Sequence, residues 1–174
     1  MPLEIRSAAP EDLETVRLLA ERIWPGCYGT MLPPGQIRYM LDWMYAPHRL
    51  RSEWDRGVRY RLAFHEGMPV GYLAWEREPG TDSAFLNKLY LVPELQGRGH
   101  GQELIRWTCR EVSAEGIRVL ELRVNRRNQK AIRAYDRAGF VVVQTLVTDI
   151  GAGFVMDDFL MRMDLEGVSS AVTV

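Results

Sequence analysis

Residues 89–101, LYLVPELQGRGHG, restrict the fold of this chain more than any other segment, because an apolar run and a proline lead directly into closely spaced glycines. Glycine loses more conformational entropy on folding than any other residue, so Gly97, Gly99 and Gly101 indicate a specific demand on the backbone. Apolar residues then recur at helical spacing as far as Val112. The segment therefore predicts a strand that passes through a tight glycine turn into a helix.

Hydrophobic periodicity predicts secondary structure along the rest of the chain. Strands are expected at residues 3–7, 60–64, 70–75, 85–92, 118–124, 140–146 and 154–163, and helices at 10–24, 36–56, 101–116 and 131–138. The first helix is expected to stop at Trp24-Pro25-Gly26, the second to break at Pro47 and the last to end at Gly139. Residues 65–69 are expected to form a hairpin loop between two strands. The strand, helix and strand of residues 85–124 form a right-handed crossover, which makes the two strands parallel. A mixed α/β fold is expected, as one domain over residues 1–166 with a flexible C-terminal tail over residues 167–174.

Composition argues against several classes of protein. Hydrophobic residues make up 47% of the 174 residues and charged residues 26%, which is typical of a globular protein and not of a disordered one. The formal net charge of −1 provides no field that would favour nucleic acid or an anionic membrane. Cys27 and Cys109 lie far apart, which argues against a disulfide framework or a zinc site. With no signal peptide and no apolar run long enough to span a bilayer, a cytoplasmic protein is expected.

The glycine turn has two explanations, which differ in whether it binds a ligand. Backbone N–H groups at a helix N-terminus are unpaired and lie at the positive end of the helix dipole, so they attract phosphate. Glycines let these groups approach a diphosphate closely, and Arg98 adds a positive charge. The alternative is a tight turn without a ligand. The spacing from Gln96 to Gly101 matches neither the dinucleotide motif G-x-G-x-x-G nor the P-loop.

Two motifs together carry a resemblance to a known family. Gln96-x-x-Gly99-x-Gly101 resembles the Gln/Arg-x-x-Gly-x-Gly/Ala signature of the GNAT superfamily of N-acetyltransferases. Asn128-x-x-Ala131-x-x-x-Tyr135-x-x-x-Gly139-Phe140 is similar to the second signature of that superfamily, at the expected separation. The resemblance covers residues 3–165. It implies a central, mostly antiparallel sheet with one splayed parallel strand pair, flanked by helices, and acetyl-CoA as donor to an amine, with no metal.

The resemblance also assigns cofactor-binding and catalytic roles to residues of this chain. The strand before the turn would carry a bulge and pair with the pantetheine arm, and one N–H group would stabilise the oxyanion. Tyr135 would protonate the leaving thiolate or, alternatively, pack in the core; a phenol of pKa ~10 can act as an acid toward a thiolate of pKa ~8.5. His100 would contact phosphate or face solvent. The implied cofactor-binding residues are Leu89, Tyr90, Leu91, Gln96, Gly97, Arg98, Gly99, His100, Gly101, Gln102, Asn128 and Tyr135, with Leu89 as the oxyanion donor.

The acceptor side is less defined, because Phe85, Asn87 and Arg123 stand where some family members have a glutamate base. Glu76 is the first candidate for a base that acts through water, ahead of Glu78, Asp82 and Glu121. Each of several other residues has two interpretations. Arg123 would either clamp a substrate carboxylate or pair with Glu121. The acids Asp157 and Asp158 would either attract a cation or form a turn. Four aromatic residues would either line the acceptor cleft or belong to the core: Tyr28, Tyr39, Trp43 and Tyr45. Asn87 completes the predicted substrate-binding set.

Other residues receive simpler interpretations. Cys109 is expected to be a packing residue and not an acyl carrier, and His48 and His65 have no companions in sequence that would make a metal site. The basic residues Arg126, Arg127, Lys130, Arg133 and Arg137 are assigned to the 3′-phosphate of coenzyme A and a solvated face, and not to nucleic acid.

Two functions remain open from the sequence. The first is acetyl-CoA-dependent N-acetylation of a small amine, such as a polyamine-like or amino-acid-like molecule, or of a protein amine. The second is a non-catalytic acyl-CoA-binding regulatory module, which the missing central glutamate motivates. The partners expected are a small-molecule or peptide acceptor, with no nucleic acid and no membrane, and a homodimer is compatible with the resemblance.

Overall fold

A computed structural model describes residues 1–168 of the chain. The helices are α1 Leu13–Tyr28, α2 Pro34–Met44, α3 Pro47–Asp55, α4 His100–Ala114 and α5 Gln129–Ala138, with short 3-10 helices η1 Pro10–Asp12 and η2 Pro93–Leu95. The strands are β1 Glu4–Ser7, β2 Arg59–His65, β3 Met68–Arg77, β4 Ser83–Leu91, β5 Val119–Asn125, β6 Val141–Gly151 and β7 Phe154–Asp164. They form a sheet in the order β1-β2-β3-β4-β5-β7-β6. Among the described pairings only β4 with β5 is parallel, which confirms the predicted mixed α/β class.

The described residues divide into two compact units that alternate along the chain. The first unit comprises Met1–Trp75 and Lys88–Gly101, and the second comprises Glu76–Asn87 and the residues from Gln102 onward. Strand β4 and helix α4 each begin in one unit and end in the other. The assignment of residues 1–166 to one domain stays a prediction. Most of the predicted tail, residues 169–174, lies outside the described part of the chain.

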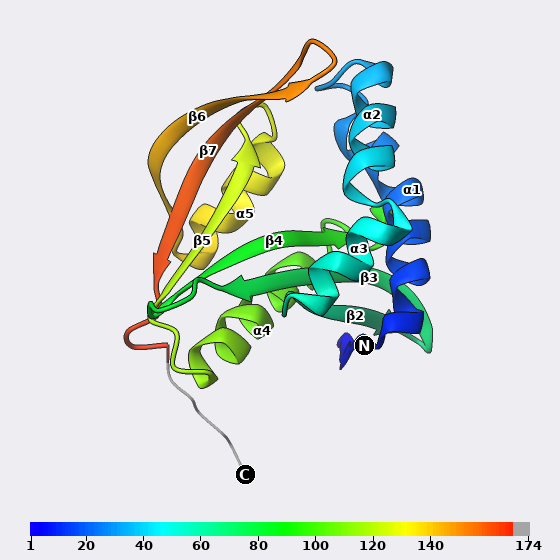
Figure 1. The fold of residues 1–174 in the computed structure, drawn as a ribbon. Helices are drawn as coiled ribbons and strands as arrows, with labels where there is room; N and C mark the ends of the chain where they lie inside the picture. Colours follow the sequence, from blue (N-terminus) through cyan, green and yellow to red (C-terminus); the bar gives the residue numbers. More distant parts are fainter. Residues whose placement is uncertain (169–174) are drawn as a thin grey trace. The chain divides into compact units, whose positions relative to one another are not determined.

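Strands β1 and β2, most of β3 and helices α1 to α3 (Figure 1) belong to the first unit, together with the end of β4 and the glycine turn. β2 and β3 form an antiparallel hairpin whose turn, Glu66-Gly67, has positive φ angles of 51° and 78°, as two-residue hairpin turns require. The hairpin expected at this position is therefore confirmed. Buried side chains of α1, among them Val16, Ala20 and Trp24, supply much of the core.

Helix α1 continues through Pro25 to Tyr28, so the predicted end at Trp24-Pro25-Gly26 is wrong. A proline inside a helix removes one backbone hydrogen bond and disfavours the turn before it. Here the Pro25 carbonyl still accepts from the N–H of Gly29 at 2.9 Å. Tyr28 packs on Trp24 with ring centroids 4.8 Å apart, and Trp24 is only 1% exposed. Tertiary packing of the last turn compensates for the local penalty.

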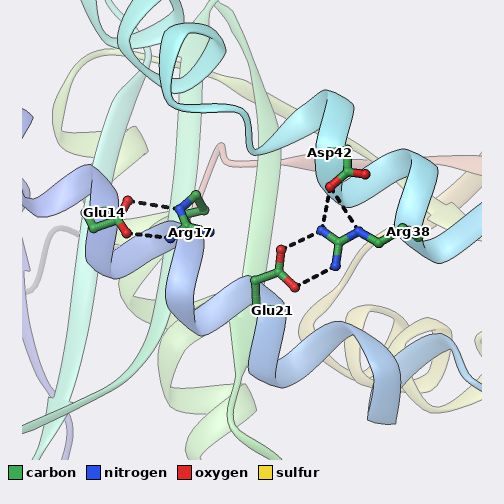
Figure 2. A network of polar contacts seen from close by, with 5 residues as sticks. All are labelled: Glu14, Arg17, Glu21, Arg38 and Asp42. Atoms are coloured by element: carbon green, nitrogen blue, oxygen red, sulfur yellow. Dashed lines mark hydrogen bonds and ion pairs between the residues drawn. The ribbon is translucent and has the colours of Figure 1, made fainter.

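A charged network on the surface connects α1 to α2 (Figure 2). Arg38 donates to Glu21 at 2.6 Å and 2.9 Å and to Asp42 at 2.9 Å. Glu14 and Arg17 form a separate pair one turn apart on α1, at 2.9 Å. All of these side chains remain substantially exposed, so solvent screens the pairs and each contributes little to stability.

The second unit contains the parallel strand pairing of the predicted crossover. β4 pairs in parallel with β5 from Ser83↔Val119 to Leu86↔Leu122, and β4 then continues to Leu91, as expected for a splayed pair. β5 and β6 each pair with β7 in antiparallel register, and the long strands β6 and β7 run side by side in orange in Figure 1. Gly139 ends α5 with a φ of 111°, where only glycine is unstrained, as predicted.

Candidate functional site

The glycine turn leads from η2 into α4, and its glycines leave space open beside the main chain. Gly97 and Gly99 have φ angles of 74° and 86°, a region that other residues rarely adopt. Within the described residues, a Cβ atom placed on Gly97, Gly99 or Gly101 would meet no atom within 4 Å apart from those of its neighbours in the chain. The glycines are therefore not required by packing against the rest of the protein. The open space lies at the first turn of α4, where backbone N–H groups lack intrahelical partners and attract anions.

Side chains around the turn have defined positions. Nε2 of Gln96 donates to the Leu91 carbonyl at 3.0 Å and so connects the turn to the end of β4. Arg98 is exposed. The ring of His100 lies 5.3 Å from that of His65, a contact that the sequence analysis did not anticipate, because the end of β2 reaches the start of α4. Within residues 1–168, no group of three or more His, Cys, Asp or Glu side chains is placed to hold a metal.

Strand β4 loses its regular alternation just before the turn. Every second residue is buried up to Lys88, but Leu89 and Tyr90 are both half-buried, and Leu91 is buried again. A β-bulge changes the phase of a strand in this way, so the burial pattern is compatible with the predicted bulge, which stays a prediction. A Cβ on Gly71 would lie 2.6 Å from the Tyr90 carbonyl oxygen, so the backbone of β4 approaches β3 closely at this point. The irregular segment coincides with Leu89–Leu91, where the family resemblance predicted pantetheine binding.

A cluster of tyrosines packs around Trp24 beside this segment. The hydroxyls of Tyr28 and Tyr90 lie 2.8 Å apart, and those of Tyr45 and Tyr72 lie 2.6 Å apart. Burial raises the pKa of both Tyr72 and Tyr90, so these phenols remain neutral. Tyr28, predicted to line the acceptor cleft, is therefore hydrogen-bonded to a predicted cofactor residue.

The remaining aromatic residues of the helical region separate into core and surface. Tyr45 is 1% exposed and belongs to the core, the second of its two interpretations. Trp43 is 39% exposed, and its ring lies 6.3 Å from that of Tyr39. The guanidinium of Arg49 stacks 4.8 Å from the Trp43 ring centroid. Tyr39 and Trp43 thus form a partly exposed aromatic pair on α2.

A buried ion pair that the sequence analysis missed lies next to the irregular segment. Nζ of Lys88 contacts Oε2 of Glu53 at 3.0 Å, and these residues are 4% and 5% exposed. Tyr60 donates its hydroxyl to the same oxygen of Glu53, and Arg49 lies 3.5 Å from the other oxygen. Burial raises the pKa of Glu53, but the Lys88 charge and the donated hydrogen bonds outweigh it and hold that pKa below the ordinary 4.5. One sign of this ion pair is present in the sequence, a lysine at a position that the alternating pattern of the strand assigns to the interior.

Two predicted acceptor-side residues contact each other in the second unit. Nδ2 of Asn87 donates to Oε2 of Glu76 at 2.8 Å. Oδ1 of Asn87 is buried and has no hydrogen-bond partner among the described residues. A buried acceptor without a donor is costly. The carboxylate oxygens of Glu76 and the amide oxygen of Asn87 are hydrogen-bond acceptors, which complement the N–H donors of an amine.

Arg123 pairs differently from the expected contact with Glu121. Its Nε lies 3.2 Å from Oδ2 of Asp158, and its Nη2 donates to Thr148 at 2.8 Å. Glu121 instead contacts Arg162, at 3.3 Å, which stands directly opposite it on β7. Residues directly opposite each other on neighbouring strands are closer than residues two apart on one strand, so Glu121 contacts Arg162 and not Arg123.

The two acids of β7 have different surroundings. Asp158 is 3% exposed, and burial raises its pKa against the opposing charge of Arg123. Asp157 remains about half exposed, and Oδ1 lies 3.4 Å from Nη1 of Arg126. Both acids thus have cationic partners within the protein, and only Asp157 is accessible.

The second motif forms the start of α5. Oδ1 of Asn128 accepts from the N–H of Ala131 at 3.2 Å and caps the helix. The ring of Tyr135, seven residues after Asn128 and half-buried, lies 5.5 Å from that of Phe140. Gln102, a predicted cofactor residue, donates its side-chain amide to the Ala134 carbonyl at 2.7 Å.

Cys109 is placed for packing. It is 4% exposed, its Sγ lies 3.6 Å from Sδ of Met163, and burial raises the pKa of the thiol to about 11. Only the thiolate is a good nucleophile, so this cysteine is not suited to carry an acyl group.

A family assignment follows from comparison of the sequence with known families. The sequence model of the Acetyltransferase (GNAT) family matches residues 21–140, more than half of the chain. The chain belongs to the GNAT family. The match includes the irregular part of β4, the glycine turn and the second motif as far as Phe140.

Individual relatives agree with the GNAT assignment. The spermidine N(1)-acetyltransferase of Thermoplasma acidophilum is 27% identical over 162 residues, which are 90% of this chain and 97% of that protein. An uncharacterized N-acetyltransferase of Mycobacterium bovis is 33% identical over 152 residues, with 87% and 97% of the two chains covered. The crystal structure of the PaiA N-acetyltransferase of T. acidophilum in complex with coenzyme A aligns with a TM-score of 0.80 at 26% identity, over 94% of this chain and 99% of that one. The GNAT fold predicted from the motifs is confirmed. Within residues 1–168 no helix is both long and apolar enough to cross a membrane.

Proposed function

We propose that this GNAT protein transfers the acetyl group of acetyl-CoA directly to a primary amine of a small polyamine-like or amino-acid-like molecule, or of a protein. The observation that carries the proposal is the space beside Gly97, Gly99 and Gly101 at the start of α4, which no atom of residues 1–168 beyond their immediate neighbours in the chain fills. It is the approach that a diphosphate needs to reach main-chain N–H groups. The spermidine acetyltransferase and the coenzyme A complex among the relatives support the same function.

The first unit would hold the donor. N–H groups of Gly97 to Gly101 and the exposed guanidinium of Arg98 would bind the pyrophosphate. The backbone of Leu89 to Leu91 would pair with the pantetheine arm, and the N–H of Leu89 would hold the charge that develops on the thioester oxygen. Acetyl-CoA supplies an activated acetyl thioester when bound.

Glu76 and Asn87 would handle the acceptor amine. An ammonium has no lone pair, so the amine must lose a proton before it can attack. The Glu76 carboxylate, held by Nδ2 of Asn87, would accept that proton through water, and Oδ1 of Asn87 would accept a hydrogen bond from the amine. We retain for Tyr135 the role that the family motif implies, donation of a proton to the leaving thiolate.

A panel of amines tests this function. Purified protein with acetyl-CoA would be offered polyamines, amino acids, aminoglycosides and peptides, and thiol release would be measured with mass-spectrometric detection of the product. The proposal expects amine-dependent thiol release with one class, and an N-acetylated product. Tight coenzyme A binding with no product from any amine would contradict it and favour a regulatory module.

Replacing Glu76 with glutamine should lower kcat about 100-fold at pH 7, because a glutamine cannot accept the proton. The deficit should shrink as the pH rises toward ~10, since the free amine then loses its proton without help. Steady-state rates from pH 6.5 to 9.5 measure both effects. Glu78→Gln, two positions along on an exposed residue, is the matched control and should leave the profile unchanged. A pH profile for Glu76→Gln parallel to that of the unmodified protein would exclude Glu76 as the base.

Tyr135→Phe should lower kcat by about 100-fold while the dissociation constant of coenzyme A stays within about twofold. The substitution removes only the hydroxyl and keeps the ring against Phe140. Stopped-assay turnover and calorimetric titration with coenzyme A separate the two quantities. Normal turnover in this variant would assign Tyr135 to packing alone.

A further inference from the structure

The interior of the first unit contains an ion pair between Glu53 and Lys88. Their charged atoms are 3.0 Å apart, and the residues are only 5% and 4% exposed. Removing two charges from water costs about as much as their attraction returns, so apolar residues of similar volume often replace such a pair without loss of stability. A gain in stability is therefore a weak explanation for this lysine. A directional contact that fixes a position is a stronger one.

Lys88 is the residue at which β4 changes its pattern. The buried positions alternate up to Lys88, and the two half-buried residues Leu89 and Tyr90 follow at once. The Lys88 ammonium contacts Glu53 of α3 and lies 5.4 Å from the ring centroid of Tyr60 on β2. The strand is thus anchored to two other elements immediately before its irregular segment.

The opposite end of the segment is anchored by different contacts. The Leu91 carbonyl accepts from Gln96 at 3.0 Å, and the N–H of Val92 donates to the Val70 carbonyl at 2.8 Å. Gly71 allows the Tyr90 carbonyl to approach closer than any side chain would permit. Leu89 and Tyr90 lie between these two anchors.

We propose that Glu53 and Lys88 are positioning residues for acetyl transfer, which fix the backbone at Leu89 so that its N–H meets the charge developing on the thioester oxygen. This inference rests on the proposed function, because it takes the Leu89 N–H as the oxyanion donor. Donors of this kind act only when held in place beforehand, and a displacement of about 1 Å can cost about 100-fold in rate. Neither side chain contacts the donor or the acceptor in this account. They act through the main chain of β4.

The double variant Glu53→Gln/Lys88→Met separates positioning from stability. It removes both charges, keeps side chains of similar size and leaves no unpaired charge in the interior. We expect its melting temperature to stay within a few degrees of that of the unmodified protein and its coenzyme A dissociation constant within about threefold. We expect kcat to fall at least about tenfold, and amide hydrogen exchange at Leu89 and Tyr90 to accelerate at least about tenfold. Turnover and exchange equal to those of the unmodified protein would overturn the proposal.

Two further variants keep the test decisive. Arg17→Met removes the exposed pair with Glu14 shown in Figure 2 and should change neither turnover nor exchange. Tyr60→Phe removes one donor to Glu53 but keeps the ion pair, and should accelerate exchange at Leu89 and lower kcat to a smaller extent. If the double variant does not fold, Tyr60→Phe decides, and unchanged exchange in it contradicts the proposal. If the unmodified protein acetylates no amine, the proposed function fails, whereas the exchange measurements still test whether the pair holds this segment.

Discussion

Valine at position 99 is expected to weaken coenzyme A binding at least about 100-fold. Gly99 has a φ of 86°, which a β-branched residue adopts only with strain of about 1–2 kcal/mol. The valine side chain would also project into the space beside the turn, where none of the described residues beyond the chain neighbours has an atom within 4 Å of the Cβ position. That space is the proposed approach of the pyrophosphate to the main chain. Isothermal titration of Gly99→Val with coenzyme A measures the loss directly.

Gly116 provides a matched control for the backbone strain. It lies just beyond the C-terminal end of α4, has a φ of 79°, and a Cβ there also meets nothing within 4 Å. Gly116→Val should therefore carry a similar penalty in stability without a loss of coenzyme A affinity. Equal losses of affinity in both variants would show that strain, and not a blocked phosphate approach, explains the effect.

Lys88→Met alone should destabilise the protein by about 3–5 kcal/mol at pH 7, because it leaves the Glu53 carboxylate buried without its ammonium partner. The double variant with Glu53→Gln should recover most of this loss. Urea denaturation followed by circular dichroism compares the unmodified protein with Lys88→Met and with the double variant. A loss in Lys88→Met that the second substitution does not relieve would contradict an electrostatic origin.

The pH dependence of Lys88→Met follows from the pKa of Glu53. In the unmodified protein this pKa lies below 4.5, so the pair stabilises the fold above that value and its contribution is lost as the pH falls through the folded-state pKa. Without Lys88, burial should raise the pKa of Glu53, and the carboxylate then destabilises the fold increasingly as the pH rises above 4.5. The difference in stability between the two proteins should accordingly be smallest once the pH falls below the folded-state pKa of Glu53 in the unmodified protein, and largest at neutral pH.

Local patterns predicted the parts of this fold that depend on near neighbours. The three glycines and the proline before them predicted the strand, turn and helix, and the β4-α4-β5 order predicted the parallel pair. Gly139 was assigned correctly as a helix end, because a left-handed φ is a local requirement. These features follow from residues close together in the chain.

Features that depend on distant residues were missed or wrong. Nothing in the sequence near Lys88 indicates that Glu53, 35 residues earlier, is its partner. Arg123 and its partner Asp158 are also 35 residues apart. Glu121 was expected as a partner of Arg123 only because it is near in the sequence. Helix α1 continues through Pro25 because Trp24 and Tyr28 pack together, which local propensity does not include. Strand pairing and core packing bring these side chains together. A single sequence does not show directly which strands pair or which side chains pack against each other.

Binding of the coenzyme A pyrophosphate by main-chain N–H groups of residues 97–101 is most directly tested by amide chemical shifts. Isotopically labelled protein would be titrated with coenzyme A, with ADP and with pantetheine, which lacks the diphosphate. The amides of Gly97, Gly99 and Gly101 should shift with coenzyme A and with ADP, and should not shift with pantetheine. Saturable binding of coenzyme A that leaves these three amides unchanged would contradict the account.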